Sequence, residues 1–414
     1  MRLLRIYLCC VGCCYAADPV QLDQLITEAL ANNREILAAQ KRVEAARQRP
    51  APARGLPDPT LSVGYSSNGG PLPGQGLGSN PTSNIGVTIS QEVTSRDKRR
   101  LRGEIALKEA DATFEDYQAV QLSVRSRVSQ AYHRLHHTWE ALEILEEGRK
   151  VLADVIHLSE ARYTAGKAPQ QDIFKAQTQL SLMETRIIKI RQDQQTAEAE
   201  INSLLNRKPG TPVGQPTEGD LFPLLLTVDE LLSKAAATAP ELRRDVAFIR
   251  RDELGVSLAR RELRPDYTIA AGYFNQGGMA PMYQLRVDIP LRLHTESRQR
   301  PMIDEKVDLL SESRRNFEAA EQTLQFRVRE AYLAAQTAWK LWQLYSDTIL
   351  PQTQLTVEAS LNAYQNGASD LAAVLTNIAA KTDVQEQLHE QSLNFALAVA
   401  RLEEMTGIEL RGSR

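Results

Sequence analysis

The spacing of hydrophobic and polar positions changes several times along the chain. From Leu22 to about Arg49, apolar residues follow helical spacing, and a group of prolines is expected to end this helix. These prolines are Pro50, Pro52, Pro57 and Pro59. Four later segments alternate apolar with polar or small residues, as strands do: 60–67, 84–93, 267–275 and 282–291. The pattern therefore predicts two pairs of strands set among helices.

A long hydrophobic seam follows each pair of strands. The first seam is Val124, Val128, Ala131, Leu135, Thr138, Leu142, Leu145, Arg149, Leu152 and Ile156, and the second is Leu324, Val328, Ala331, Ala335, Ala338, Trp342, Tyr345 and Ile349. A repeat of ~3.5 residues is typical of coiled-coil packing. The first helix is expected from about Arg96 to Thr164, roughly 100 Å at ~1.5 Å per residue, which is too long for a compact domain. Gly166 and Gly367 are expected to end these helices, with amphipathic helices running back to about Asn206 and Met405.

The same order of motifs occurs twice. Pro57-Asp58 recurs as Pro265-Asp266, and the turn Tyr163-Thr164-Ala165-Gly166 recurs as Tyr364-Gln365-Asn366-Gly367. This indicates a duplicated unit of roughly 190 residues. We expect a first repeat over 18–206, a Pro- and Gly-rich linker over 207–226, and a second repeat over 227–414.

The N-terminal residues have the pattern of an export signal. Arg2 and Arg5 precede a short apolar run that ends in small residues, so 1–17 is expected to be a signal peptide. A buried N-terminal strand or helix is the alternative. All 4 cysteines lie in this region, and the run Cys10-Val11-Gly12-Cys13 resembles a lipoprotein box with Cys13 as the lipidated residue. The mature chain is therefore expected to be exported without a disulfide framework.

Composition narrows the functional class. A formal net charge of -3 gives no bulk electrostatic reason to expect nucleic acid as a partner. No later window approaches the ~18 apolar residues of a membrane helix, whereas the strands are close to the ~9–11 residues of a tilted strand in a bilayer. Four strands cannot close a barrel, so several chains would have to share one. Three chains would give twelve strands and room for a lumen, which favours a conduit from the periplasm to the exterior.

Over essentially its whole mature length, the chain resembles the TolC-type outer-membrane efflux proteins. The resemblance rests on the motif order in both repeats, including Ala29-Leu30-Ala31-Asn32-Asn33-x-Glu35-Ile36 and the strand end Ser90-Gln91, although Arg34 stands where the family often has proline. It implies an α+β membrane protein: a homotrimer with a shared 12-stranded barrel in the outer membrane of a Gram-negative bacterium, contacting its lipid, above a periplasmic helical tunnel. It also implies a periplasmic adaptor and an inner-membrane pump of the resistance-nodulation-division type as partners. Ser90-Gln91-Glu92 followed by the basic run 98–102 is similar to the branch that serves heavy-metal pumps.

The resemblance also implies candidate functional residues. The adaptor would contact the helical tip at Gly166, Lys167, Ala168, Gly367, Ala368 and Ser369, although a plain helix-to-helix turn is the alternative. The constriction would involve Tyr364 and Asp172, the alternative being an ordinary capping contact. The usual arginine falls at Ser369 and the deeper acidic ring at Ala373 and Thr376, so Asp370 is expected to replace part of that ring.

Other polar clusters give weaker signals. His133, His136 and His137 have metal-ligand spacing but no supporting framework, and we expect a solvated helix face rather than a metal site. The basic run Arg96 to Arg102 is expected to be a solvated helix start, or to lie near lipid phosphates. No catalytic arrangement stands out, so neither an enzyme nor a cofactor is expected. The alternative to a channel is a periplasmic coiled-coil structural or adaptor protein, and the sequence does not identify a substrate.

Overall fold

The computed structural model describes residues 19–68, 70–217 and 222–410, which form two compact units. The first unit comprises 1–37, 120–239 and 324–414, and the second comprises 38–119 and 240–323. The description of the first unit begins at Pro19. Each unit therefore combines segments from both halves of the sequence.

The first unit is helical. It contains α1 (Leu22–Asn32), α5 (Gln170–Leu204), α6 (Val228–Thr238), the π-helical turn η2 (Tyr345–Ile349), α9 (Leu350–Gln365) and α10 (Leu371–Thr406), with the C-terminal parts of α4 (Arg96–Thr164) and α8 (Arg300–Leu344). The core of this unit contains the expected seam: Val124, Val128 and Leu135 are fully buried, whereas Arg149 is exposed. Each such buried aliphatic side chain contributes roughly 1.5–3 kcal/mol.

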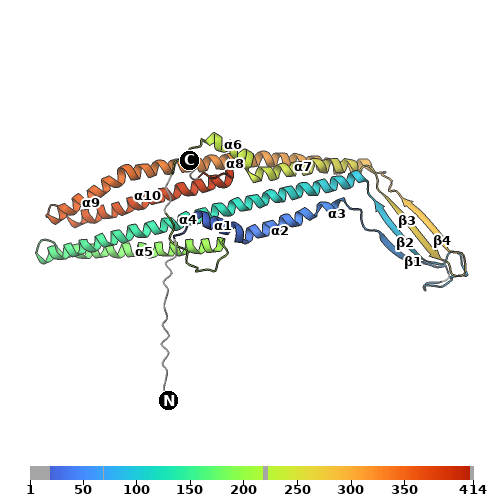
Figure 1. The fold of residues 1–414 in the computed structure, drawn as a ribbon, viewed down its shortest axis with the longest axis horizontal. Coiled ribbons are helices and arrows are strands. Elements are labelled where there is room, and N and C mark those ends of the chain that lie inside the picture. Colours follow the sequence, from blue (N-terminus) through green and yellow to red (C-terminus); the bar gives the residue numbers. More distant parts are fainter. Residues whose placement is uncertain (1–18, 69, 218–221, 411–414) are drawn as a thin grey trace, which may run out of the picture. The chain divides into compact units, whose positions relative to one another are not determined.

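The second unit contains one antiparallel sheet of order β1-β2-β3-β4. Its elements are most of α2 (Arg34–Gln48), then α3 (Pro50–Arg54), β1 (Thr60–Ser66), β2 (Asn84–Val93), α7 (Pro240–Arg261), β3 (Tyr267–Asn275), β4 (Met282–Asp288) and the π-helical turn η1 (Thr295–Gln299). In Figure 1 the blue strands β1 and β2 lie beside the yellow strands β3 and β4, so the sheet joins two distant parts of the sequence. The four expected strands are present, but β4 ends at Asp288 instead of Leu291. Asp288 already faces Thr268 near the start of β3, and Pro290 has no amide to continue the ladder.

The first helix is not continuous to Arg49, which corrects the sequence-based boundary. The chain leaves helical geometry at Asn33, where φ is -64° and ψ is 128°. The Asn33 side chain accepts hydrogen bonds from the amides of Glu35 (2.8 Å) and Ile36 (3.3 Å) and donates to the carbonyl of Leu204 (2.9 Å). This side chain therefore caps α2 and attaches it to the end of α5.

The prolines after α2 also behave differently from the prediction. Pro50 and Pro52 lie inside the short helix α3, because proline is tolerated in a first helical turn, where its missing amide has no partner to lose. The backbone becomes extended at Gly55, with ψ 161°.

The order helix, two strands, long helix and return helix is the same from α1 to α5 and from α6 to α10. Trp139 and Trp339 are separated by 200 positions, whereas Tyr163 and Tyr364 are separated by 201. The π-helical turn η2 lies between Trp339 and Tyr364, and such a turn accommodates one additional residue in a helix. The second long helix thus keeps its seam on either side of an insertion.

Among the described helices, none combines the length and the apolar character needed to cross a bilayer.

Candidate functional site

Two tight turns join the long helices of the first unit to their return helices. Gly166 has a φ of 68° and Gly367 a φ of 77°, in the left-handed region where glycine has no Cβ to clash. The glycine amides donate to the carbonyls of Tyr163 (2.9 Å) and Tyr364 (3.1 Å). The next amide in each turn reaches one residue further back, Lys167 to Arg162 and Ala368 to Ala363, both at 2.8 Å. These paired bonds satisfy the last helical carbonyls and fix both reversals.

The residues expected at the tip lie on these turns. Gly166, Lys167, Gly367 and Ala368 are exposed, and Ala168 and Ser369 are half-buried. Small side chains here leave the backbone of each turn accessible to another molecule.

The expected constriction residues are both buried. Tyr364 is 1% exposed and belongs to the apolar core that joins α4, α5, α9 and α10. Its ring lies 4.3 Å from the guanidinium carbon of Arg162, and its hydroxyl is 3.3 Å from Ser159 Oγ. Asp172 is 9% exposed in the first turn of α5. Within the described residues, the Tyr364 hydroxyl pairs with Ser159 and not with Asp172. Neither Ser159 nor Arg162 is predicted as a site residue from the sequence alone.

Asp370 caps the helix that it precedes. It is exposed, and its carboxylate accepts a hydrogen bond of 3.0 Å from the amide of Ala373 at the start of α10. A carboxylate at a helix N-terminus satisfies a free amide and complements the helix dipole.

A groove of about 800 Å³ lies between α5 and α10 beside the turns. Phe174, Leu375 and Thr376 are among the residues that line it. Phe174 is 56% exposed, which is unusual for a large aromatic side chain. The ion pair of Arg186 with Asp383, at 3.1 Å, links the two helices.

The sheet of the second unit has one apolar face. The ladder registers align Leu61, Ile89, Ala271 and Leu285 in one row, and Val63, Val87, Tyr273 and Tyr283 in the next. The alternate rows contain mainly small or polar residues. Ser62, Thr88, Gly272 and Gln284 form one of them, and another holds Phe274 and Met282 beside Gly64 and Gly86. The apolar side chains remain accessible, with Val63 at 72% and Leu285 at 77% exposed. A large exposed apolar surface of this kind marks an interface with lipid or protein.

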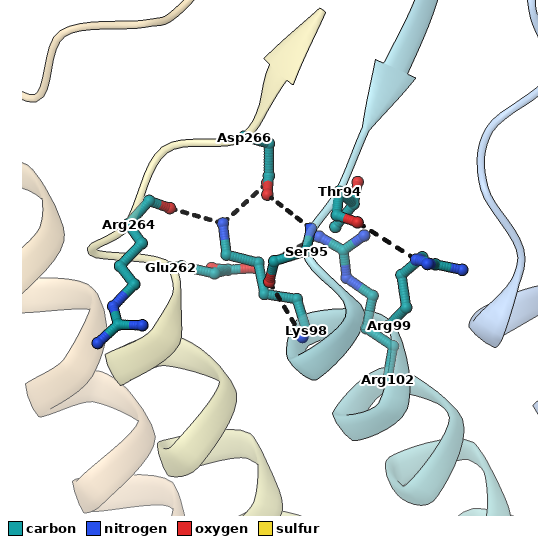
Figure 2. A network of polar contacts seen from close by, with 8 residues as sticks. All are labelled: Thr94, Ser95, Lys98, Arg99, Arg102, Glu262, Arg264 and Asp266. Atoms are coloured by element: carbon teal, nitrogen blue, oxygen red, sulfur yellow. Dashed lines mark hydrogen bonds and ion pairs between the residues drawn. The ribbon is translucent and has the colours of Figure 1, made fainter.

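The basic run at the start of α4 is partly buried, which corrects the expectation of a solvated helix start. Lys98 is 1% exposed, and its Nζ donates to Asp266 Oδ2 (2.8 Å) and to the carbonyl of Arg264 (2.6 Å). The Ser95 amide donates to Asp266 Oδ1 (3.2 Å). In Figure 2 the Lys98 side chain extends from the first turn of α4 to the segment that enters β3. This ion pair therefore fastens the end of β2 to the start of β3.

The three histidines are not on a fully solvated face, which is a second correction. His133, His136 and His137 line a cavity of about 370 Å³, together with Glu140 and His389 from α10. Burial and the nearby His389 lower the pKa of His137, which favours its neutral form. No group of three potential ligands within the described residues has the geometry to hold a metal ion. His389 and Glu140 were not identified from the sequence.

Cys13 and the expected signal peptide lie outside the described residues.

The family comparison matched a large part of the chain. Residues 25–207 match the family model described as outer membrane efflux protein. A search of curated proteins found no matching sequence.

Solved structures match nearly the whole chain. The outer-membrane channel OprN is 15% identical, with a TM-score of 0.78 over 93% of this chain and 89% of its own. CusC, studied for folding and transmembrane channel formation, is 17% identical, with a TM-score of 0.79 over 94% of this chain and 93% of its own. The outer membrane protein VceC from Vibrio cholerae is 16% identical, with a TM-score of 0.78 over 94% of this chain and 97% of its own. OprN is described as an outer-membrane channel and CusC as forming a transmembrane channel. Residues 25–207 thus match the outer membrane efflux protein family, and more than nine-tenths of the chain has the fold of the outer-membrane channel OprN and of CusC.

Proposed function

We propose that this chain is the outer-membrane channel of a tripartite efflux system. It would conduct substrates from a periplasmic adaptor and an inner-membrane pump to the exterior. The observation that carries the proposal is the four-stranded sheet. It has one exposed apolar face, and its edge strands β1 and β4 have no further partner strand among the described residues.

The apolar face fits the hydrocarbon of a bilayer. Its side chains are accessible, and apart from Phe274 and Met282 the alternate rows hold polar or small residues. This is the pattern of a barrel wall between lipid and an aqueous lumen. An open sheet edge is not stable in lipid, because its amides and carbonyls have no partner there. The two edges therefore require neighbouring strands, which further copies of this chain supply.

Three copies are the assembly that we propose. Two copies would give eight strands, a number whose interior is filled by side chains, whereas three would give twelve and a lumen. The helices also carry exposed apolar residues that neighbouring copies would cover: Phe174, Leu182 and Ile188 on α5. Each chain would then consist of two repeats of one ancestral unit, 18–206 and 227–414, joined by the linker 207–226.

We propose the two turns as the adaptor contact, and Tyr364 and Asp172 as separate contributors to the constriction at that end, since among the described residues the Tyr364 hydroxyl contacts Ser159 and not Asp172. Asp172→Ala removes the carboxylate and should raise the single-channel conductance in planar bilayers. Asp193→Ala is the matched control, because Asp193 is an exposed aspartate on the same helix. A small conductance in Asp172→Ala, equal to that of the control, would refute the constriction but not the channel.

Heavy-metal cations are the substrate class suggested by the sequence resemblance, with the pump and adaptor making the selection. The positions of the deeper acidic ring hold Ala373 and Thr376, so the channel itself would select cations weakly.

Fractionation of cells tests the proposal. The protein should enter the outer-membrane fraction, migrate as an SDS-resistant oligomer that heating converts to monomer, and form trimers on chemical crosslinking. A soluble periplasmic monomer would contradict the channel and favour the structural or adaptor alternative.

A further inference from the structure

Within the described residues, the ion pair of Lys98 with Asp266 has no second example, although the sequence contains the Pro-Asp motif twice. Asp266 stands directly before β3 in the motif Pro265-Asp266, and Asp58 stands before β1 in the motif Pro57-Asp58. Asp266 pairs with Lys98, whereas Asp58 is exposed and has no ion pair within the described part of the chain. Asp58 thus has the position of an ion-pair partner at the unpaired edge of the sheet.

The counterpart of Lys98 in the second half is Arg298. The buried seam positions Val124 and Val128 correspond to Leu324 and Val328, a separation of 200 that holds along α8. Continued from α8 into the π-helical turn η1, which accommodates one additional residue, this separation places Arg298 within one residue of the position of Lys98. Arg298 is exposed, and among the described residues it too has no ion-pair partner.

Its neighbours in η1 are less suitable partners for a carboxylate. Glu296 is acidic, and it already forms an ion pair with Arg300 at 2.8 Å. Arg298 is therefore the unpaired cation of this turn.

The strand registers show how two copies would meet. Thr60 faces Ser90 in the first hairpin and Thr268 faces Asp288 in the second, so β1 corresponds to β3 at a separation of 208, and β2 to β4 at 198. The central ladder pairs Ile89 with Ala271. Under the same correspondence, Val287 of one copy faces Val63 of the next.

The side chains support this register independently. It places Ile289 against Leu61 and Leu285 against Tyr65, so the apolar face continues from one copy to the next. On the other face Asp288 meets Ser62. A slip of one residue would reverse this pairing and place polar residues beside apolar ones.

From these observations we propose an intersubunit seam in which β4 of one copy pairs with β1 of the next in the register Val287 to Val63. Arg298 of the first copy and Asp58 of the next form an ion pair at the end of this seam. The pair repeats between copies the contact that Lys98 and Asp266 make within the chain. The inference rests on the proposed channel and adds its specific contacts.

Cysteine crosslinking tests the register. The variant Val63→Cys/Val287→Cys should form intermolecular disulfides between strands in outer membranes. Each single cysteine variant is a control for the chain's own 4 cysteines, all within residues 9–14. The pair Val63→Cys/Arg286→Cys is a register control, because its side chains would point to opposite faces. Equal crosslinking of the two pairs, or none with the predicted pair in a stable oligomer, would overturn the register.

A charge swap tests the ion pair. Asp58→Arg and Arg298→Asp should each shorten the half-life of the SDS-resistant oligomer about tenfold or more, because each leaves like charges facing at the seam. The double variant should return to within about threefold of wild type. Asp58→Arg/Arg300→Asp is the matched control and should show no recovery, since Arg300 pairs within its own chain.

The outcomes separate this inference from the channel itself. The ion pair is overturned if the charge-swap double variant dissociates as fast as the less stable single variant while the predicted cysteine pair still crosslinks. This result leaves the channel proposal intact. A wild-type protein that forms no oligomer overturns both.

Discussion

The ion pair between Lys98 and Asp266 gives the sharpest prediction about stability. Asp266→Asn removes the negative charge but keeps an oxygen that can accept from the Ser95 amide. The Lys98 ammonium would then remain buried, at 1% exposure, with the Arg264 carbonyl as its acceptor. We expect this change to loosen the junction of α4 with β3.

The magnitude follows from the geometry. At 2.8 Å and an effective dielectric of ~20, the attraction between the two charges is about 6 kcal/mol. The cost of removing both ions from water offsets most of this, so the intact pair contributes little net stability. Removing one partner leaves the desolvation cost of the other, typically ~3–5 kcal/mol. We take ~3 kcal/mol for Asp266→Asn, because Asp266 is itself 18% exposed and water can reach the site.

Hydrogen exchange measured by mass spectrometry detects this local change. A loss of ~3 kcal/mol corresponds to roughly 100-fold lower protection of amides at the start of α4 and of β3. Lys98→Met is the comparison, since it leaves the carboxylate at the partly exposed position and should cost less. Lys98→Met/Asp266→Asn should recover most of the protection, because it leaves no buried charge. Unchanged protection in Asp266→Asn would refute the assignment of Lys98 as a buried, charge-compensated side chain.

Three further predictions concern the helical unit. The folded protein lowers the pKa of His137 below 6.5, so on acidification the unfolded chain takes up a proton first; thermal stability should fall below about pH 6.5, and His137→Gln should lose part of this dependence. Gly367→Ala places a side chain at φ 77° and should lower stability by ~1 kcal/mol in denaturant titrations, whereas Ala368→Gly, the adjacent control, should not show this strain. Asn33→Ala removes the cap of α2 and should cost ~1–2 kcal/mol, seen as faster exchange of the Glu35 and Ile36 amides; equal exchange in the variant would contradict the cap.

Periodicity predicts the regular elements of this chain well. The limits of α4, β2 and β3 agree with the sequence prediction, because uninterrupted seven-residue and two-residue repeats are local patterns. The positive φ of Gly166 and Gly367 follows in the same way from the need to reverse a helix within a few residues.

Contacts between distant segments were predicted less well. Asn33 interrupts a helical pattern because its side chain reaches Leu204, 171 residues away. Lys98 appeared as one member of a basic run, since nothing local distinguishes it from Arg99 or Arg100; its burial depends on Asp266, at the start of another strand. The repeated Pro-Asp motif was the available signal for that contact.

In the candidate site too, features set by local sequence were predicted and contacts between distant segments were not. The glycine turns were found from local sequence, and the residues expected at the tip lie on them. The packing of Arg162 over Tyr364, and the hydroxyl of Ser159 beside it, depend on how α4 and α9 pair across about 200 residues of sequence. His389 likewise reaches the cavity beside His137 from another helix.

Single-channel recording of the purified protein in planar lipid bilayers tests the central claim most directly. The membrane insertion of the same preparation can be verified by flotation of liposomes. If the chain forms an outer-membrane conduit, inserted protein should produce discrete unitary current steps, with larger steps in Asp172→Ala if the constriction is also correct. Protein that inserts as an oligomer but gives no current steps at any voltage, in wild type or in this variant, would contradict the account.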